Sequence, residues 1–277
     1  MKAFEAIIKV LQTTMEEPKA GGAMHLTALG VTIVLAVLLC IFFRNSDNKT
    51  FRIILTCIWA VMFVMEVLKQ VSTSCVIAPD GTISWHYNWS HFTFQLCDTP
   101  IYLLLPVAFL PDGKVRSALS TYMATYILLG GMATYLFPAS IYSTSLYCNV
   151  HSLVHHGLQI ASCSFIGVHN RKDLTLYNFL LAFIIFLAAD AAAVLFNVGL
   201  HFWHPEQHVN MFFISPYEIK HVPDFLYDGW KALGWGGRLA LYVVGVSALA
   251  FGIFWAYRGF IALSRRIQKK KADQTAA

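Results

Sequence analysis

Long apolar segments separated by short polar connections recur along the whole chain. A helix needs about 20 mostly apolar residues to cross about 30 Å of hydrocarbon. Seven segments meet this condition: Met24–Phe43, Phe51–Val71, Thr93–Leu110, Ser117–Phe137, Asn149–Val168, Leu174–Leu200 and Arg238–Ile261. Their apolar residues occur all round the helix, whereas the strands of a membrane barrel alternate apolar and polar positions. The pattern predicts an all-α polytopic membrane protein, a bundle of about seven transmembrane helices.

Three regions follow from the same pattern. Residues 1–23 place Phe4, Ile7, Ile8, Leu11 and Met15 at helical spacing opposite Lys and Glu, which predicts an amphipathic segment on the membrane surface. Residues 24–261 form a single transmembrane bundle, and residues 262–277 form a basic tail. The longest connection, residues 201–237, is rich in His, Pro and aromatic residues and is predicted to fold on the outer membrane interface.

Composition and charge set the class and the orientation. The 277 residues are 57% hydrophobic and 13% charged, with a mean hydropathy of +0.57, which excludes an ordinary soluble domain. Thirteen of the 20 Lys and Arg residues lie in three alternate connections and the C-terminal tail. Because short cytoplasmic connections retain positive charge, the protein is predicted to lie in a cell membrane with its N-terminus outside and its C-terminus on the cytoplasmic side. The net charge of +5 is thus largely a topology signal, and no nucleic-acid partner is predicted.

Ionisable side chains inside the spans are few, and each is costly enough in a membrane to be a functional candidate. From the predicted topology they fall in the outer half of four helices. They are Glu66, Cys97, Asp98, His151, His155, His156 and Asp190, with Asn197 above Asp190.

A thiol in apolar surroundings is inert until a base or a positive field favours the thiolate. A nearby His is the usual activator, and a carboxylate can orient that His. Cys97 as nucleophile and His155 as base, oriented by Glu66 or Asp190, satisfy this logic. A regular helix beginning at Pro100, capped by Asp98 or Thr99, would also place Cys97 near a helix N-terminus that favours an anion.

Other interpretations stay open at this stage. Cys97 can be an apolar filler, Asp98 a helix cap or partner of a backbone N–H, and Glu66 an interhelical hydrogen-bonding group. His151 and His155 stand four residues apart, a spacing that suits zinc, yet no Cys or carboxylate completes a compact motif, so no metal is predicted. Cys75 and Cys148 fall in predicted outer loops and could be bridged in an oxidising compartment.

Four short motifs also resemble, in order, the YwaF family of bacterial integral membrane proteins, which is related to transmembrane protein 164, an acyltransferase that handles phospholipids. They are QLC at residues 95–97, GGMATYLFP at 130–138, HSLVHHG at 151–157 and VNMFFISP at 209–216. The resemblance implies that Cys97 is a nucleophile and His155 its base, and that Glu66, Gln95 and Asn210 match other polar positions. The sequence departs from the family at Gln95, where many relatives have His, and at Asp98 and Pro100.

The leading functional prediction is therefore a lipid acyltransferase or transacylase of the outer leaflet. Cys97 would form a thioester with the acyl group of a membrane phospholipid, without a cofactor, and Gln95, Asn210 or backbone N–H groups would stabilise the oxyanion. Attack by water would instead make the protein a lipid ester hydrolase. The alternative is a transporter or ligand-binding receptor whose polar cavity is lined by Glu66, His155 and Asp190.

Overall fold

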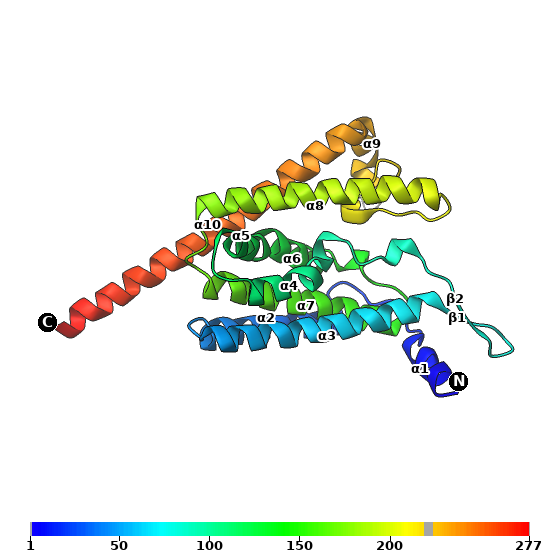
Figure 1. Cartoon of the computed structure of the whole chain (residues 1–277), viewed down its shortest axis with the longest axis horizontal. Helices are drawn as coiled ribbons and strands as arrows, with labels where there is room; N and C mark the ends of the chain where they lie inside the picture. The colour runs from blue at the N-terminus through cyan, green and yellow to red at the C-terminus, as the bar shows by residue number, and fades with distance from the viewer. Residues whose placement is uncertain (1, 219–223, 277) are drawn as a thin grey trace.

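The computed structural model describes residues 2–218 and 224–276, and α-helices dominate this part of the chain (Figure 1). The helices are α1 (Lys2–Leu11), α2 (Ala23–Phe42), α3 (Asn48–Ser74), α4 (Pro100–Phe109), α5 (Lys114–Tyr122), α6 (Leu128–Leu136), α7 (Leu146–His169), α8 (Leu176–Trp203), α9 (Asp224–Ala232) and α10 (Gly234–Ala276). A two-stranded antiparallel hairpin joins β1 (Cys75–Ile77) to β2 (Ile83–Trp85). Short helical turns are η1 (Trp89–His91), η2 (Leu96–Asp98), η3 (Met123–Ile127), η4 (Pro138–Ser140) and η5 (Met211–Phe213).

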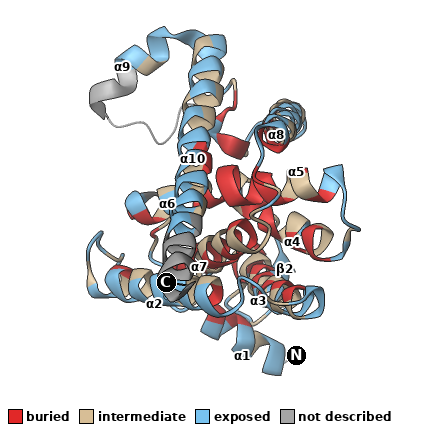
Figure 2. Cartoon of the chain, turned by 90° about the vertical axis from the view of Figure 1, so that its left-hand side faces the viewer, coloured by how far each residue is buried: buried red, intermediate tan, exposed pale blue. Residues whose placement is uncertain are grey.

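The prediction of an all-α membrane protein is confirmed. Helices α2, α3 and α8, and residues Gly234–Ser264 of α10, are each long and apolar enough to cross a membrane. Figure 2 shows buried residues gathered in the centre of the bundle and exposed ones on its outer helices. The exposed positions are apolar: Val31 on α2, Ile184 on α8 and Val244 on α10 are 63%, 59% and 65% exposed. An exterior of this kind is suited to hydrocarbon rather than to water.

Short polar side chains fix where several helices begin. Asp47 accepts a hydrogen bond from the Thr50 N–H at 2.8 Å before α3, and Ser145 accepts one from the Cys148 N–H at 3.2 Å before α7. Both satisfy backbone donors that the first helical turn leaves unpaired. As predicted, α4 begins at Pro100, whose missing N–H is not needed at this position, and Thr99 is its N-cap.

The structure differs from the sequence prediction in four places. The third predicted span, Thr93–Leu110, contains only the turn η2 and the ten-residue helix α4, because regular helix begins at Pro100. The fourth predicted span is one rod made of α5, the π-helical turn η3 and α6. The hairpin β1–β2 has no counterpart in the prediction, because its strands are only three residues long. Helix α10 continues to Ala276, beyond the predicted end of the last span. Residues 219–223 of the predicted outer connection, and most side chains of the predicted basic tail, lie outside the described part.

The N-terminal helix is docked on the bundle as well as being amphipathic. Ile8 and Leu11 are buried, while Phe4 and Ile7 are 48% and 51% exposed. Just after the helix, Gln12 donates from Nε2 to the carbonyl oxygens of Ser72 at 2.9 Å and Cys75 at 2.7 Å. These bonds tie the segment to the end of α3. All six cysteines are free thiols, so Cys75 and Cys148 are not bridged.

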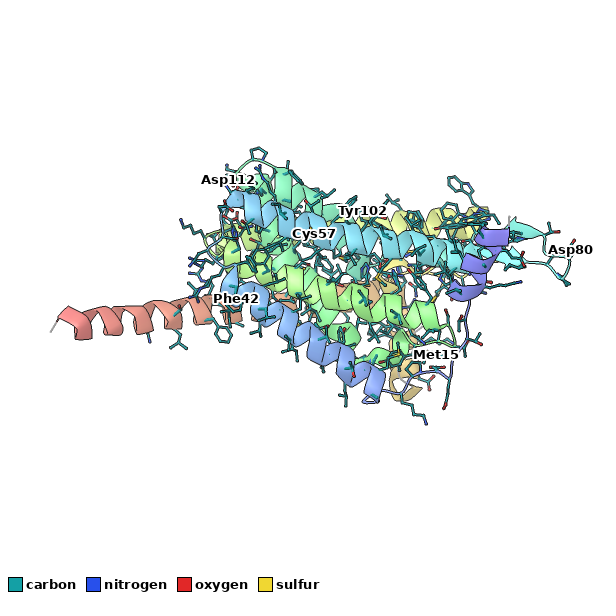
Figure 3. The ribbon with its side chains drawn as sticks, turned by 90° about the horizontal axis from the view of Figure 1, so that it is seen from below. Met15, Phe42, Cys57, Asp80, Tyr102 and Asp112 are labelled. Atoms are coloured by element: carbon teal, nitrogen blue, oxygen red, sulfur yellow. The ribbon has the colours of Figure 1, made fainter. Side chains whose placement is uncertain are left out.

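The two ends of the bundle carry different connections. Figure 3 places Met15 and Asp80 at one end and Phe42 and Asp112 at the other. At the second end Arg171 donates to the Arg44 carbonyl at 3.1 Å and to Asn45 Oδ1 at 2.9 Å, so two of the basic connections meet there. That this end faces the cytoplasm stays a prediction from the positive-inside rule.

Helix α7 packs so closely on α2 that Gly157 leaves no room for a side chain. A Cβ at this position would lie 2.5 Å from Thr32 Oγ1 and 3.1 Å from the Tyr135 hydroxyl, two groups that are hydrogen-bonded to each other. We expect Gly157→Ala to lower the free energy of unfolding by about 1–3 kcal/mol, the usual cost of overpacking a core. Thermal unfolding in detergent measures this. The control is Gly245→Ala in α10, where a Cβ meets nothing within 4 Å; equal Tm values for the two variants would contradict the prediction.

Candidate active site

The predicted nucleophile and base meet where η2 faces α7. His155 Nε2 lies 3.1 Å from the carbonyl oxygen of Cys97 and 3.9 Å from Asp98 Oδ1. Carbonyl and carboxylate oxygens accept hydrogen bonds and cannot donate them. A neutral imidazole in this position therefore carries its proton on Nε2, which donates to the Cys97 carbonyl. The lone pair of the ring is then on Nδ1, which is buried and has no hydrogen-bond partner. Among the described residues, no hydrogen bond joins His155 to the Cys97 sulfur.

Asp98 closes the turn that carries Cys97. Its Oδ2 accepts a hydrogen bond from the Gln95 N–H at 2.8 Å, which confirms the interpretation of Asp98 as partner of a backbone N–H. Its Oδ1 faces His155. One carboxylate therefore holds the backbone of η2 and also lies beside the imidazole, the position that the sequence analysis assigned to Glu66 or Asp190.

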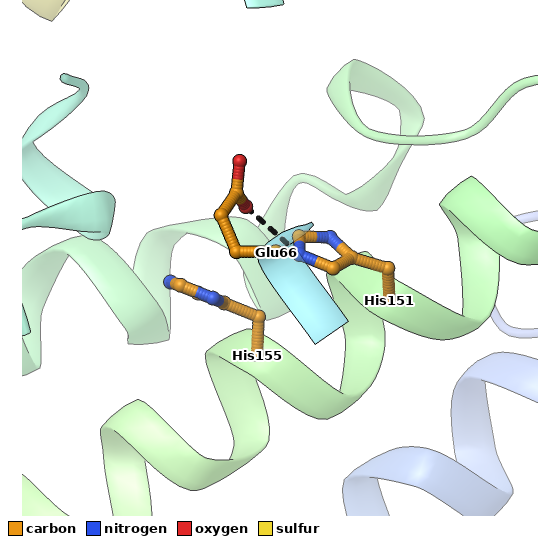
Figure 4. A group of neighbouring side chains, drawn as sticks. All are labelled: Glu66, His151 and His155. Carbon is orange, nitrogen blue, oxygen red and sulfur yellow. Dashed lines mark ion pairs between the residues drawn. The ribbon is translucent and has the colours of Figure 1, made fainter. Parts of the chain in front are cut away.

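Glu66 on α3 is the centre of a second set of contacts. Its Oε1 accepts hydrogen bonds from Thr93 at 2.5 Å and Gln70 at 2.6 Å and lies 2.7 Å from Lys69 Nζ. Its Oε2 lies 3.0 Å from His151 Nε2 without the alignment of a hydrogen bond. Figure 4 shows the Glu66 carboxylate directed at the ring of His151, with the ring of His155 on the next turn of α7. Glu66 therefore pairs with His151 and lies near His155, the ring that it was one of two carboxylates expected to orient.

His156 and Asp190 lie outside these contacts. His156 donates from Nδ1 to the Ser152 carbonyl one turn earlier at 2.6 Å, and its Nε2 is buried without a partner. Asp190 on α8 has no hydrogen-bond partner on either oxygen, and its electrostatic neighbours are the phenols of Tyr122, Tyr126 and Tyr242. The structure therefore does not place Asp190 in contact with His155.

Gln95 and Asn197 hold the segment around η5 by its backbone. The Gln95 amide donates to the Asn210 carbonyl at 3.0 Å and accepts from the Phe212 N–H at 2.7 Å. The Asn197 amide bonds in the same two-sided way to Met211, at 3.0 Å and 2.7 Å. In this segment Phe212 and Phe213 have φ values of 56° and 60°, which is the left-handed conformation. Such a conformation costs about 1–3 kcal/mol per residue and persists only where the surrounding structure imposes it.

These contacts change the roles expected of the polar residues. The Gln95 amide is engaged by the η5 segment and is not free to stabilise an oxyanion. Asn210 accepts from the Ser215 N–H with Oδ1 at 2.9 Å, while its Nδ2 is buried and has no partner. Of the two side chains predicted to stabilise the oxyanion, Gln95 and Asn210, only Asn210 therefore has an N–H group that no hydrogen bond occupies. No sequence motif signals the clamping role of Gln95 and Asn197, because their partners are backbone atoms far along the chain.

An apolar groove of about 490 Å³ lies elsewhere, between α2 and α7. It is lined by Val31, Tyr135, Leu153 and Gly157 among others, and by none of the candidate site residues. On a helix with 100° per residue, Leu153 and Gly157 point away from the face that carries His151 and His155. The groove is consequently separate from the site.

These features define an α-helical membrane protein with a buried cluster of cysteine, histidine and carboxylate residues near one end of its bundle. The family comparison agrees with the resemblance to transmembrane protein 164. The chain belongs to the TMEM164 family, whose model matches residues 20–257 and so includes every candidate site residue. No curated protein and no solved structure matches the chain. Membership of the YwaF family in particular stays a prediction.

Proposed function

We propose that this protein is a phospholipid acyltransferase of a cell membrane, with Cys97 as nucleophile and His155 as base. The observation that carries the proposal is the 3.1 Å contact between His155 Nε2 and the Cys97 carbonyl, which keeps an imidazole against the cysteine residue itself. Membership of the TMEM164 family supports it.

The reaction begins with transfer of the Cys97 thiol proton to the free nitrogen of His155. Because the resting hydrogen bond runs to the carbonyl, the ring or the thiol must turn once a lipid is bound; catalytic contacts often tighten only in the substrate complex. The thiolate attacks the carbonyl carbon of an acyl ester, and His155 returns the proton to the departing alkoxide, leaving a thioester on Cys97. The hydroxyl of a second lipid, deprotonated by His155, then attacks the thioester. The new ester leaves, and His155 returns the proton to the Cys97 thiolate.

The negative oxygen formed in each step needs donors. Asn210 Nδ2 and the backbone N–H groups at the start of α4 are the candidates, and the helix N-terminus adds a favourable field. The Asp98 carboxylate beside Nε2 favours the imidazolium that forms while the proton is on His155. Both effects lower the barrier without a metal or a dissociable cofactor.

The depth of the site suits a lipid ester. Glu66 stands eight residues before the end of α3, which corresponds to about 12 Å below the helix end at 1.5 Å per residue. The bundle exterior at this level is apolar, so a phospholipid can approach with its chains in hydrocarbon. A transporter or receptor cavity would need Asp190 beside Glu66 and His155, and among the described residues no hydrogen bond or ion pair joins Asp190 to either.

The direct test is to trap the acyl-enzyme. The purified full-length protein is incubated with a phospholipid carrying a labelled acyl chain, and label that hydroxylamine releases is located by peptide mapping. We expect it on Cys97 and its loss in Cys97→Ala, whereas Cys57→Ala, which removes an exposed thiol, retains it. Equal labelling of Cys97→Ala and the parent protein would refute a covalent intermediate on Cys97. Transfer to a lysophospholipid, compared with release of free fatty acid, separates an acyltransferase from a hydrolase.

A further inference from the structure

We propose that Glu66, His151 and His155 form a binding site for a divalent transition-metal ion, for which Zn²⁺ is the probe. One ligand atom from each of the three residues lies within 4.8 Å of the other two, and all three residues are buried. Two histidines and one glutamate are a known zinc ligand set that leaves a fourth position for water. Among the groups of His, Cys, Asp and Glu that the structure describes, this is the one with such geometry.

Each residue offers an atom that the protein leaves without a hydrogen bond. These atoms are Glu66 Oε2, His151 Nε2 and His155 Nδ1. Glu66 Oε2 and His151 Nε2 form an ion pair with each other, and His155 Nδ1 has no partner. Buried polar atoms rarely lack a hydrogen bond in folded proteins, so this cluster calls for an explanation. Glu66 Oε2 and His151 Nε2 lie 3.0 Å apart, close to the separation of about 3.3 Å between ligands of a tetrahedral zinc ion. The other separations in the cluster are at most 4.8 Å, so rotation of the side chains must bring His155 closer to enclose a metal.

The outer contacts of the cluster are those of a metal site. A metal-binding histidine usually donates its other ring N–H to a carbonyl or carboxylate, which fixes the ring and its tautomer. His155 does so with the Cys97 carbonyl at 3.1 Å. The second carboxylate oxygen of Glu66 is in turn held by Lys69, Gln70 and Thr93.

Charge also favours a cation here. The Glu66 carboxylate lies 2.7 Å from Lys69 Nζ, and the Asp98 carboxylate lies 3.9 Å from His155 Nε2, so two carboxyl groups and one ammonium group border the cluster. A proton on His151 is the competing occupant, because an imidazolium at 3.0 Å would pair with Glu66. Metal and proton therefore compete for the same atoms, and the two occupants can be told apart by direct measurement of bound metal.

Occupancy by metal has a consequence that rests on the proposed function. A zinc ion bound at His155 Nδ1 takes the lone pair that would accept the Cys97 proton, so the metal-bound protein cannot form the acyl-enzyme. Zinc is thus expected to inhibit the transfer and a chelator to restore it. The binding itself does not depend on Cys97 acting as a nucleophile.

The experiment measures Zn²⁺ bound to the full-length protein in detergent by equilibrium dialysis and elemental analysis. We expect one high-affinity ion per chain and affinity at least tenfold weaker in His151→Ala and Glu66→Gln. His151→Ala removes one ligand while leaving the hydrogen bonds of Glu66 to Lys69, Gln70 and Thr93 in place, so it tests the site even where Glu66→Gln fails to fold. X-ray absorption should show nitrogen and oxygen ligands at about 2.0–2.2 Å and no sulfur at about 2.3 Å.

Two controls separate this site from other histidines and from the chemistry. The pair His204→Ala and His208→Ala, in the outer connection where the rings lie beside Glu206 and Glu218, should bind zinc as the parent does. Cys97→Ala should also bind zinc as the parent does. Failure of the proposed acyl transfer can then be distinguished from failure of the proposed zinc site. The absence of stoichiometric zinc, or affinity unchanged by His151→Ala, would overturn the proposal in favour of a protonated His151 paired with Glu66.

Discussion

Replacing His155 with Gln should slow the formation of acyl-Cys97 by about 10²–10⁴-fold, the usual contribution of a positioned general base. The glutamine amide can still donate to the Cys97 carbonyl, as Nε2 does in the parent, but it cannot accept a proton. The rate of hydroxylamine-sensitive labelling of Cys97, measured before the label saturates, reports this step directly.

His155→Ala provides the comparison that separates chemistry from positioning. Alanine removes both the base and the hydrogen bond to the Cys97 carbonyl, so its loss should equal or exceed that of glutamine. A matched surface control is His204→Ala, since the His204 side chain is 41% exposed directly after α8 and contacts Glu206 at 3.3 Å. If the labelling rate of His155→Gln were within about threefold of the parent rate, His155 could not be the general base, because a positioned base contributes about 10²–10⁴-fold. Assignment of the base to His156, whose Nε2 has no partner, would then be the next step.

The architecture could be predicted from sequence because a membrane span has an unambiguous signal. Each of α2, α3, α7 and α8 begins and ends within three residues of the predicted segment. The rod of α5, η3 and α6 was predicted as one span, but its π-helical turn was not, since a hydropathy pattern carries no information on hydrogen-bond register. The end of α10 was missed because Lys, Arg and Ala continue a helix as readily outside the membrane as within it.

The candidate site could be predicted only as a set of residues at one depth. Depth follows from position along a span, and it correctly grouped Glu66, Cys97 and His155. Which carboxylate faces which ring depends on the rotation of α3 and α7 about their axes, and that rotation is set by packing. Hence Asp98 lies beside His155, Glu66 beside His151, and Asp190 apart from both. The hydrogen bonds of the Gln95 and Asn197 amides could not be predicted from the sequence either, because their partners are backbone atoms around η5.

The largest effect on stability should come from Glu66→Leu. Lys69 and Glu66 have side chains only 16% and 7% exposed, and their charged groups lie 2.7 Å apart. Removing one member of a buried ion pair leaves the other uncompensated and typically costs about 3–5 kcal/mol. Here we expect about 3 kcal/mol, the lower end of that range, because Asp98 still attracts Lys69 and Gln70 keeps the His91 carbonyl as acceptor at 2.8 Å.

A second substitution tests whether the stranded ammonium is the cause. In Glu66→Leu with Lys69→Met the pair is replaced by apolar side chains of similar length, a change that is often neutral in a buried site. The double variant should therefore recover more than half of the loss in thermal unfolding measured in the same detergent. A double variant no more stable than Glu66→Leu alone would show that Glu66 acts mainly through Thr93 and Gln70, which lose Glu66 Oε1 as an acceptor in both proteins. Recovery would instead mean that Glu66 stabilises the fold chiefly by neutralising Lys69 through Oε1.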